Sequence, residues 1–363
     1  SGRDSSLFDR LPSATSILAT VLDNGNTYHF TEYQNSHQFN FCYRDLHSKL
    51  LNCEISVNLP VRIAHANLYY QRMGRHDVSR QSIFFEPNIW LRGNAWEIKA
   101  KMNSEFPDLT TMVNYRDDSN PMNIILGNTQ LRNIHYYDIE GGKTFEGKKH
   151  SRLNINMGYH QTDNAVAYSL VFDKQTGVST VQPISVNGNY RMDLGIGYTR
   201  PLDKKEKLSI DNQASFNYNH NVDMAMVQGT AQSSWSIVNN WKISNVLKLN
   251  YRPDDNYEFT LHGGGTYYLI KSQREGFSNI HAGDYNIGVN VQVALPWKLQ
   301  LTTDLTMFAH RGYQLSEMNT TDWIWNAQLS RSFINKKLLV KLQGFDILRQ
   351  LSNTQYIMNA QGR

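Results

Sequence analysis

Residues 284–308 alternate between apolar and polar side chains. Nine successive odd positions are apolar, and the even positions between them are mostly polar or small: Tyr285, Ile287, Val289, Val291, Val293, Leu295, Trp297, Leu299 and Leu301. Neighbouring side chains of a β-strand point to opposite faces, so this period of two predicts two strands joined by a turn near Pro296. Each strand has one apolar and one polar face, and the fold depends on what the apolar face contacts.

The same period recurs along nearly the whole chain. It is found in residues 96–102, 153–159, 190–198, 208–218, 241–251 and 257–269. Two of these segments carry an asparagine on the otherwise apolar side, at Asn212 and Asn245. Since no stripe with a 3.6-residue period is present, the chain is predicted to be all-β, with about 15–17 strands between Thr15 and Ile357.

Short and long connections alternate between the predicted strands. Short turns are expected at residues 59–60, 92–94, 146–149, 202–206, 253–256, near Pro296 and at 334–337. Longer polar links are expected at residues 107–133, 173–177, 221–233, 273–283 and 313–321. Outer-membrane barrels join their strands by short periplasmic turns and long extracellular loops, whereas a β-sandwich gives no reason for this regularity.

Strand length and tryptophan placement favour the same architecture. Residues 178–200 and 234–252 each form a continuous run of about 20 residues, and a tilted strand needs roughly 9–11 to cross a bilayer. Near predicted strand ends lie Trp90, Trp96, Trp297, Trp323 and Trp325. Amphipathic rings favour the lipid headgroup level, although an ordinary core tryptophan is the alternative at each position. The apolar face is therefore predicted to contact lipid, in a sheet that closes into a barrel.

Composition limits the other classes. No run approaches 18 apolar residues, so no membrane helix is predicted. The net charge is only +4 over 363 residues, without a long Lys/Arg block, so no nucleic-acid partner is expected. No Pro-, Ser- or charge-rich linker divides the chain, and residues 1–363 are treated as one domain. Because it starts at Ser1 without a signal peptide, we expect a processed or excised piece of a longer protein.

The two cysteines are predicted to be free thiols. Phe41 marks the apolar side of its strand at odd positions, which places Cys42 on the polar side. Ile55 likewise places Cys53 on the apolar side of the next strand. Residues opposite one another in an antiparallel pair share a face, so a disulfide between them would need a bulge.

The stretch NPMNIILGNTQLR, residues 120–132, resembles a signature of TonB-dependent outer-membrane receptors. In that signature a Pro and an apolar pair precede Gly-Asn-Pro and Leu-Lys-Pro-Glu. The matching positions are Pro121, Leu126, Gly127, Asn128 and Leu131, with Arg132 in place of the Lys. Thr129, Asn133 and Ile134 depart from the signature. Residues 186–202, 295–305 and 322–350 also resemble barrel strands of this superfamily.

The resemblance implies an antiparallel transmembrane β-barrel portion, with the family's remaining strands, up to about 22 in all, lying elsewhere. The plug, the TonB-contacting box, a carboxypeptidase-regulatory-like domain, several early strands and the final strand are expected outside residues 1–363. These residues alone are therefore not expected to close or to transport. The implied role of the parent is to bind and import a nutrient, such as a metal chelate, glycan or peptide, in the cell outer membrane. The implied partners are outer-membrane lipid, the TonB complex acting through the plug, a surface lipoprotein and an unknown extracellular ligand.

No catalytic site, metal site or cofactor is predicted. Neither His-Glu-x-x-His nor Cys-x-x-Cys occurs. The glycines at 263–265 open no helix, so they suit a bend or a close backbone approach rather than a phosphate loop. His262 and His310 fall on polar, lumen-facing positions, where a wetted histidine is favoured over a metal ligand. The Met-Ala-Met run at 224–226 is expected in a long loop.

Polar residues predicted to face the lumen are Arg191, Asp193, Asp211, Glu258, Asn290 and Asp304. They line a substrate path or, in the favoured interpretation, hydrogen-bond to one another, to water or to the plug. The link at 107–133 is the most function-like loop, but its signature is expected to organise the barrel rather than contact ligand.

The sequence is compatible with three functions: a nutrient transporter, a non-transporting outer-membrane barrel with a structural or surface-interaction role, and a soluble β-rich binding module such as a lectin-like sandwich. An enzyme is the least supported class.

Overall fold

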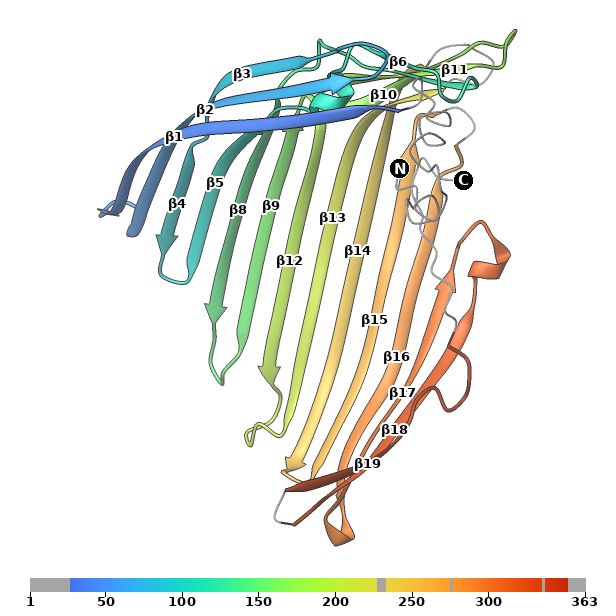
Figure 1. Cartoon of the computed structure of the whole chain (residues 1–363). Helices are drawn as coiled ribbons and strands as arrows, with labels where there is room; N and C mark the ends of the chain where they lie inside the picture. Colours follow the sequence, from blue (N-terminus) through green and yellow to red (C-terminus); the bar gives the residue numbers. More distant parts are fainter. Residues whose placement is uncertain (1–26, 227–232, 275–276, 335–336, 352–363) are drawn as a thin grey trace.

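The computed structural model describes residues 27–226, 233–274, 277–334 and 337–351. They form two β-sheets, a main sheet of 15 strands and a cap sheet of four (Figure 1). The described residues therefore confirm the prediction of an all-β fold. Among these residues no helix is long and apolar enough to cross a bilayer.

The main sheet has the order β1-β2-β4-β5-β8-β9-β12-β13-β14-β15-β16-β17-β18-β19, and β3 pairs with β2. Its strands are β1 (His29–Ser48), β2 (Cys53–Gln71), β3 (Val78–Phe85), β4 (Asn88–Gly93), β5 (Trp96–Glu105), β8 (Ile134–Glu146), β9 (Arg152–Asp163), β12 (Asn189–Pro201), β13 (Leu208–Met226), β14 (Ser233–Asp254), β15 (Tyr257–Ser272), β16 (Ile280–Leu295), β17 (Leu299–Arg311), β18 (Thr321–Phe333) and β19 (Leu338–Gly344). All of its pairings are antiparallel.

The cap sheet has the order β10-β11-β7-β6 and lies at one end of the main sheet (Figure 1). Its strands are β6 (Arg116–Asp117), β7 (Asn123–Leu126), β10 (Ala165–Phe172) and β11 (Ser179–Val186). The short helix η2 (Leu109–Met112) precedes β6. A buried apolar core joins η2 and the segment after β7 to β2 and β3; it consists of Ala66, Leu68, Val78, Leu109, Met112, Val113 and Leu131.

Connections at the two ends of the main sheet differ in length. At the turn end, tight connections follow Gly93, Glu146, Pro201, Asp254, Leu295 and Phe333. At the opposite loop end, β5 reaches β8 through η2, β6 and β7, and β9 reaches β12 through the hairpin of β10 and β11. The predicted alternation of short and long connections is therefore confirmed for most of the chain.

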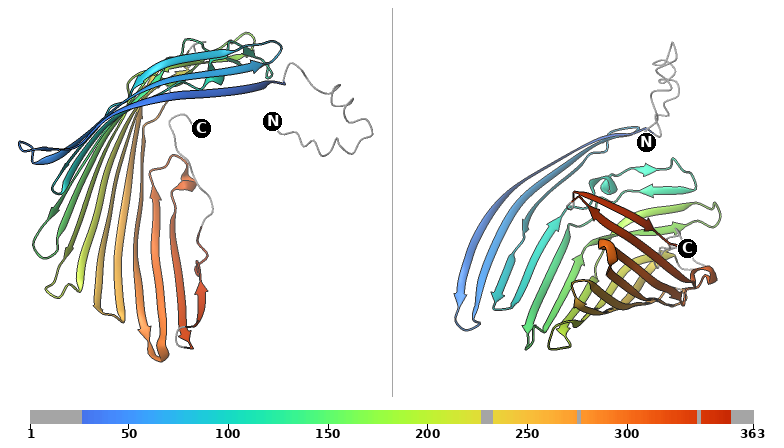
Figure 2. Two further views of the ribbon diagram at one scale, coloured as in Figure 1. Left: turned by 60° about the vertical axis from the view of Figure 1, so that its left-hand side comes forward. Right: turned by 90° about the horizontal axis from the view of Figure 1, so that it is seen from below.

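The main sheet is curved and open (Figure 2). β1 and β19 stand at the two ends of the strand order and do not pair with each other in the described part of the chain. These described strands form no closed barrel.

Several expectations about individual segments were wrong. The number of strands was not among them: the main sheet has 15 strands, within the predicted 15–17, and the cap sheet adds four because connections at the loop end form strands of their own. Residues 224–226 belong to β13, where Met224 pairs with Trp235, and not to a loop. The run at 178–200 is two strands in different sheets, β11 and β12. No turn occurs at 59–60, since β2 continues through Pro60. The predicted strands before residue 27 lie outside the described residues.

Candidate functional site

Strand register aligns the apolar sides of neighbouring strands into one continuous face. Leu261 in β15 pairs with Leu249 in β14 and with Val289 in β16. Val289 in turn pairs with Leu305 in β17, which pairs with Trp325 in β18. Because antiparallel partners share a face, a single apolar face extends across the main sheet. We call this the apolar face, and the opposite side the polar face.

Large aliphatic side chains on the apolar face are exposed. Ile243, Leu261 and Ile287 keep about half of their accessible surface, at 50%, 49% and 51%. Among the described residues, the cap sheet contacts the main sheet chiefly through β10, which approaches β13 and β14 at the loop end. No second layer of described residues packs over the middle of the apolar face. An apolar surface of this extent marks an interaction with lipid or with another protein.

Aromatic rings form a row across the apolar face near the loop end, the loop-side girdle. Tyr159 in β9 lies 6.0 Å from Tyr190 in β12, measured between ring centroids. Tyr190 lies 5.8 Å from Tyr218 in β13, and Tyr218 lies 5.1 Å from Trp241 in β14. The row continues across β15, β16 and β18 with Tyr267, Tyr285, Trp323 and Trp325.

A second aromatic row, the turn-side girdle, lies next to the turns. Its members are Trp96, Phe145, Tyr198, Tyr251, Phe259 and Phe333. Eight residues separate the girdles in β12, from Tyr190 to Tyr198, and ten in β14, from Trp241 to Tyr251. At roughly 3.3 Å per residue and a tilt of about 45°, this spacing corresponds to about 19–23 Å, close to the roughly 25 Å apolar band of outer-membrane barrels.

Only some of the predicted headgroup-level tryptophans occupy this face. Trp96, Trp323 and Trp325 lie on it, and Trp297 lies in the turn between β16 and β17. Trp90 pairs with Lys99 on the polar face, where the Arg92 guanidinium stacks 3.6 Å from its ring centroid. The expectation for Trp90 was therefore wrong, because it considered distance from a strand end but not which face the residue occupies.

The two asparagines on the apolar face satisfy each other. Asn212 in β13 donates its amide Nδ2 to Oδ1 of Asn245 in β14 at 3.1 Å, and Asn245 donates back at 3.2 Å. Both sit between the two girdles. A paired amide exposes fewer unsatisfied polar atoms than a single one, which lowers the penalty of an apolar environment.

A chain of charged side chains crosses the polar face on four adjacent strands. Lys101 Nζ lies 3.5 Å from Asp138, and Asp138 lies 2.5 Å from Nδ1 of His160. His160 Nε2 lies 3.4 Å from Asp193, which also contacts Arg191 Nε at 2.7 Å. Because both ring nitrogens face carboxylates, His160 links β8 to β12 across β9.

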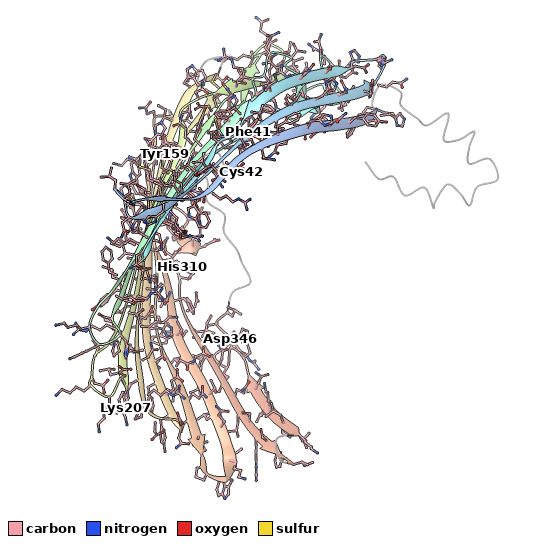
Figure 3. The ribbon with its side chains drawn as sticks, turned by 90° about the vertical axis from the view of Figure 1, so that its left-hand side faces the viewer. Phe41, Cys42, Tyr159, Lys207, His310 and Asp346 are labelled. Atoms are coloured by element: carbon pink, nitrogen blue, oxygen red, sulfur yellow. The ribbon has the colours of Figure 1, made fainter. Side chains whose placement is uncertain are left out.

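All polar residues predicted to face the lumen lie on this polar face. Some bond to their cross-strand neighbours: Asp211 to Thr199 at 2.9 Å and Asp304 to Asn326 at 3.0 Å. His262 of β15 reaches across Gly288 of β16 to Thr306 of β17 at 3.3 Å. Asp284 accepts from His310 at 2.7 Å. Figure 3 shows His310 toward the inner side of the curved sheet, Tyr159 toward the outer side, and Lys207 at the turn end. In the described part of the chain, no three His, Cys, Asp or Glu side chains converge as a metal site.

Cysteine geometry agrees with the prediction of two free thiols. Cys42 is exposed and lies 2.9 Å from Oδ1 of Asn58, whereas Cys53 is buried and pairs with Ser48. They occupy different register positions of the β1–β2 pair, so no disulfide joins them.

Gly127 and Asn128 of the signature tie together the segments of the cap, by which we mean the cap sheet and η2. Gly127 passes so close to η2 that an added Cβ would lie 1.8 Å from the Val113 carbonyl oxygen. The next residue, Asn128, donates its backbone N–H to the Thr111 carbonyl at 2.9 Å and its side-chain Nδ2 to the Pro183 carbonyl at 2.8 Å. One residue therefore joins the segment before β6 to β11.

The other signature positions are structural as well. Leu131 is 1% exposed and belongs to the core beneath β2 and β3. Leu126 ends β7, and Pro121 lies in the exposed turn before it, where the Asn123 N–H donates to the Asn120 carbonyl at 2.9 Å. A pocket of about 350 Å³ lies beside Leu126 and Gly127 and is also lined by Tyr70, Tyr115, Asp117 and Tyr168.

Replacing Gly127 with alanine is expected to destabilise the cap by about 1–3 kcal/mol, because the backbone at Val113, directly after η2, must move to admit the methyl group. Urea unfolding of the two proteins measures this difference. Gly265→Ala is the matched control, since a Cβ at Gly265 would meet its nearest atom at 3.8 Å. Equal stability of the Gly127 and Gly265 variants would show that the backbone at Val113 moves to admit the methyl group without loss of stability.

A partly buried ion pair ties Arg72, the residue after β2, to Asp117 at the end of β6. The Arg72 side chain is 3% exposed and donates to Asp117 at 2.9 Å. The hydrogen bond from Arg72 is the main reason that the pKa of Asp117 falls from 3.8 to about 2. Since the carboxylate is stabilised in the folded state, its contribution is present above about pH 4 and disappears as the pH falls toward about 2.

Acid is therefore expected to loosen the cap. Limited proteolysis of the segment around β6 and β7 should accelerate as the pH falls from about 4 to about 2, and Asp117→Asn should give fast cleavage already at pH 6. Asp118→Asn is the control, because Asp118 is 62% exposed and lies 3.9 Å from Arg116. Identical cleavage of the wild type and Asp117→Asn at pH 6 would exclude this role.

Five residues of the charged chain and the Arg72 ion pair were not predicted: Arg72, Lys101, Asp117, Asp138 and His160. The alternating pattern holds a usable signal for His160, which shares its face with Asn154 and Asn156, and for Lys101, which lies opposite the apolar side of Ile98. Arg72 and Asp117 are separated by 45 positions and meet only through the fold of the cap.

A scan against protein-family models, a search of curated proteins and a search of solved structures each found no match to the chain.

Proposed function

We propose that the chain is part of the wall of an outer-membrane β-barrel of the TonB-dependent receptor type, whose parent protein binds and imports a nutrient. The observation that carries the membrane part of this proposal is the pair of aromatic girdles on one uncovered apolar face. They are separated by eight to ten residues along the strands. Aromatic belts at this separation mark the two interfaces of a bilayer.

Exposure of the apolar face argues against a soluble binding module. A β-sandwich buries its apolar side against a second sheet. Here aliphatic side chains between the girdles, such as Ile287 at 51% exposure, have no covering layer among the described residues. Lipid tails supply that cover without leaving exposed apolar surface in water.

The polar face supports an aqueous interior. It carries the charged chain from Lys101 to Arg191 and the pairs at Asp304 and Asp284, which need water or polar partners. A barrel with water on its inner side places such residues in the lumen. The turn end then lies toward the periplasm, and the cap lies toward the outside, where a ligand arrives.

The receptor assignment rests on the signature around Gly127 and Asn128, and the structure gives these residues a role in fixing the cap. A cap held rigidly at the outer end of a barrel provides a surface for an incoming solute. Import by the parent requires energy delivered through the plug that the family resemblance implies.

Membrane fractionation and growth assays test the two parts of the proposal separately. The protein is expected to sediment with outer membranes and to require detergent for extraction. Deleting its gene should abolish growth on at least one of a panel of ferric chelates, oligosaccharides and peptides, and deleting the plug should have the same effect. A soluble, monodisperse protein would exclude the membrane wall, and unimpaired growth on the whole panel would favour a non-transporting barrel.

A further inference from the structure

A groove runs along the apolar face beside the turn-side girdle. Its volume is about 420 Å³ and its lining is almost wholly apolar. It exists because Gly141 in β8 stands between two large side chains, pairing with Ile98 of β5 and Met157 of β9. Without a side chain at the central position, the neighbouring strands form two walls with a trough between them. We call this the Gly141 groove.

Aromatic and aliphatic side chains complete the groove toward the turn end. Trp96 and Phe145 belong to the turn-side girdle, and Ile155 extends the wall formed by Met157. Exposed fractions of 41% for Ile98 and 60% for Met157 show that the groove is open along its length. An open apolar trough of this form accepts a linear hydrocarbon chain.

One cation lies at the end of the groove. Lys143 is exposed, pairs with Trp96 and Ile155, and places its Nζ 4.8 Å from the centroid of the Phe145 ring. The nearest acidic side chain along β5, Glu97, faces the other side of the sheet, where it binds Trp90 at 3.2 Å and Lys99 at 3.2 Å. Lys143 is therefore a positive charge on an apolar surface, at the level of the girdle.

We propose that the Gly141 groove binds one anionic phospholipid, with an acyl chain along Gly141 and the phosphate at Lys143. This inference rests on the proposed membrane location of the apolar face. Lysine side chains near a bilayer interface reach toward the headgroups, and a cation there attracts anionic lipids. The trough and the cation together match both parts of such a lipid, whereas a soluble peptide or a free phosphate matches only one of them.

The neighbouring turn adds to the positive potential. Lys148 and Lys149 lie in the connection between β8 and β9, directly beyond Phe145 in the same hairpin, and both are exposed. Under the proposed orientation this turn projects into the headgroup region. Two carboxylates lie near this turn, Glu146 at the end of β8 and Glu206, which lies 2.7 Å from His150. Lys143, Lys148, Lys149 and Arg152 outnumber them, so charge complementarity favours an anionic headgroup over a zwitterionic one.

Native mass spectrometry of the protein in neutral detergent tests the site, with phosphatidylglycerol and phosphatidylcholine as the added lipids. The wild type is expected to retain one phosphatidylglycerol in preference to phosphatidylcholine. Lys143→Gln should weaken phosphatidylglycerol binding about fivefold, the factor that corresponds to about 1 kcal/mol per lysine near an anionic surface, and should leave phosphatidylcholine unchanged.

Gly141→Leu tests the trough independently. A Cβ at Gly141 would lie 3.5 Å from its nearest neighbours, so the larger side chain enters the groove without moving the backbone. It should weaken retention of both lipids. Gly265→Leu is the control, since Gly265 lies on the same face in β15 and outside the groove.

Arg331→Gln controls for charge alone. Arg331 also lies on the apolar face near a turn, with its guanidinium 4.6 Å from the centroid of Phe333 two residues further on. Equal weakening by Lys143→Gln and Arg331→Gln, or full retention of lipid by Gly141→Leu, would overturn the proposal. If the protein inserts into bilayers and one of these two results is found, the lipid site is excluded and the membrane wall stands. If the protein needs no detergent, the membrane wall itself is excluded.

Discussion

Replacing Val289 with arginine is expected to destabilise the protein in a lipid bilayer by about 2–4 kcal/mol, the penalty for a cation on the lipid side of a barrel near the midplane. Val289 lies between the two girdles on the apolar face, opposite Leu261 and Leu305. Its neighbours on that face among the described residues, Leu261 and Leu305, offer an arginine no counter-charge. The expected effect is a large loss of folded, membrane-inserted protein.

Asn290→Arg is the matched control, because Asn290 is the next residue in the same strand and faces the polar side opposite Asp304. Its effect is expected to stay within about 0.5 kcal/mol, as for surface substitutions away from buried features. Urea unfolding of both variants in lipid vesicles gives the comparison. Equal destabilisation at 289 and 290 would mean that the two faces of β16 do not meet different solvents.

Truncating Leu131 to alanine is expected to destabilise the cap by about 2–5 kcal/mol, the range found when a fully buried leucine leaves a cavity. Leu131 is 1% exposed and lies in the same core as Leu68 of β2 and Met112 of η2. This core is the apolar contact between the segment after β7 and the main sheet. Its loss should release the segment that carries the signature.

Hydrogen exchange of β7 and η2 measures that release, and Ile125→Ala is the control. Ile125 lies in β7 on the same segment but is 46% exposed, so its truncation leaves no comparable cavity. Slow exchange in Leu131→Ala, as in the wild type, would show that the signature holds the cap through its hydrogen bonds alone.

The faces of the main sheet were predictable from the sequence because a period of two is a local property of each strand. The alternation at 284–308 assigns Val289 and Asn290 to opposite faces without any tertiary information, and the register of β16 agrees. Turns such as those after Gly93 and Asp254 follow from breaks in the same pattern. The pairing of Asn212 with Asn245 did not follow, because it depends on the stagger between β13 and β14.

Pro60 shows why one turn was wrongly predicted. A proline lacks the N–H that a central strand needs, which favours a break. Here β2 changes its partner at this point: β4 pairs as far as Asn58, and β3 begins to pair at Val61. The missing N–H falls in the gap between these partners, and the Pro60 carbonyl accepts from the Glu86 N–H at 3.0 Å.

The cap was the least predictable part. Strands β11 and β12 alternate with the same period, so the sequence does not show that they belong to different sheets. The chain turns between them at Gly188, whose φ of 100° is open to glycine and strained for other residues. Contacts such as Arg72 with Asp117 then depend on where the whole hairpin docks, which no local pattern encodes.

Spin labels placed singly at each position from 285 to 293, after Cys42 and Cys53 are replaced by alanine, test most directly whether one face of the sheet meets lipid. In bilayers, collision of the label with oxygen should peak at Tyr285, Ile287, Val289, Val291 and Val293, and collision with a water-soluble nickel chelate should peak at the even positions between them. An alternation in the opposite sense, or equal access of both reagents to all nine positions, would contradict a wall with lipid on one side and water on the other.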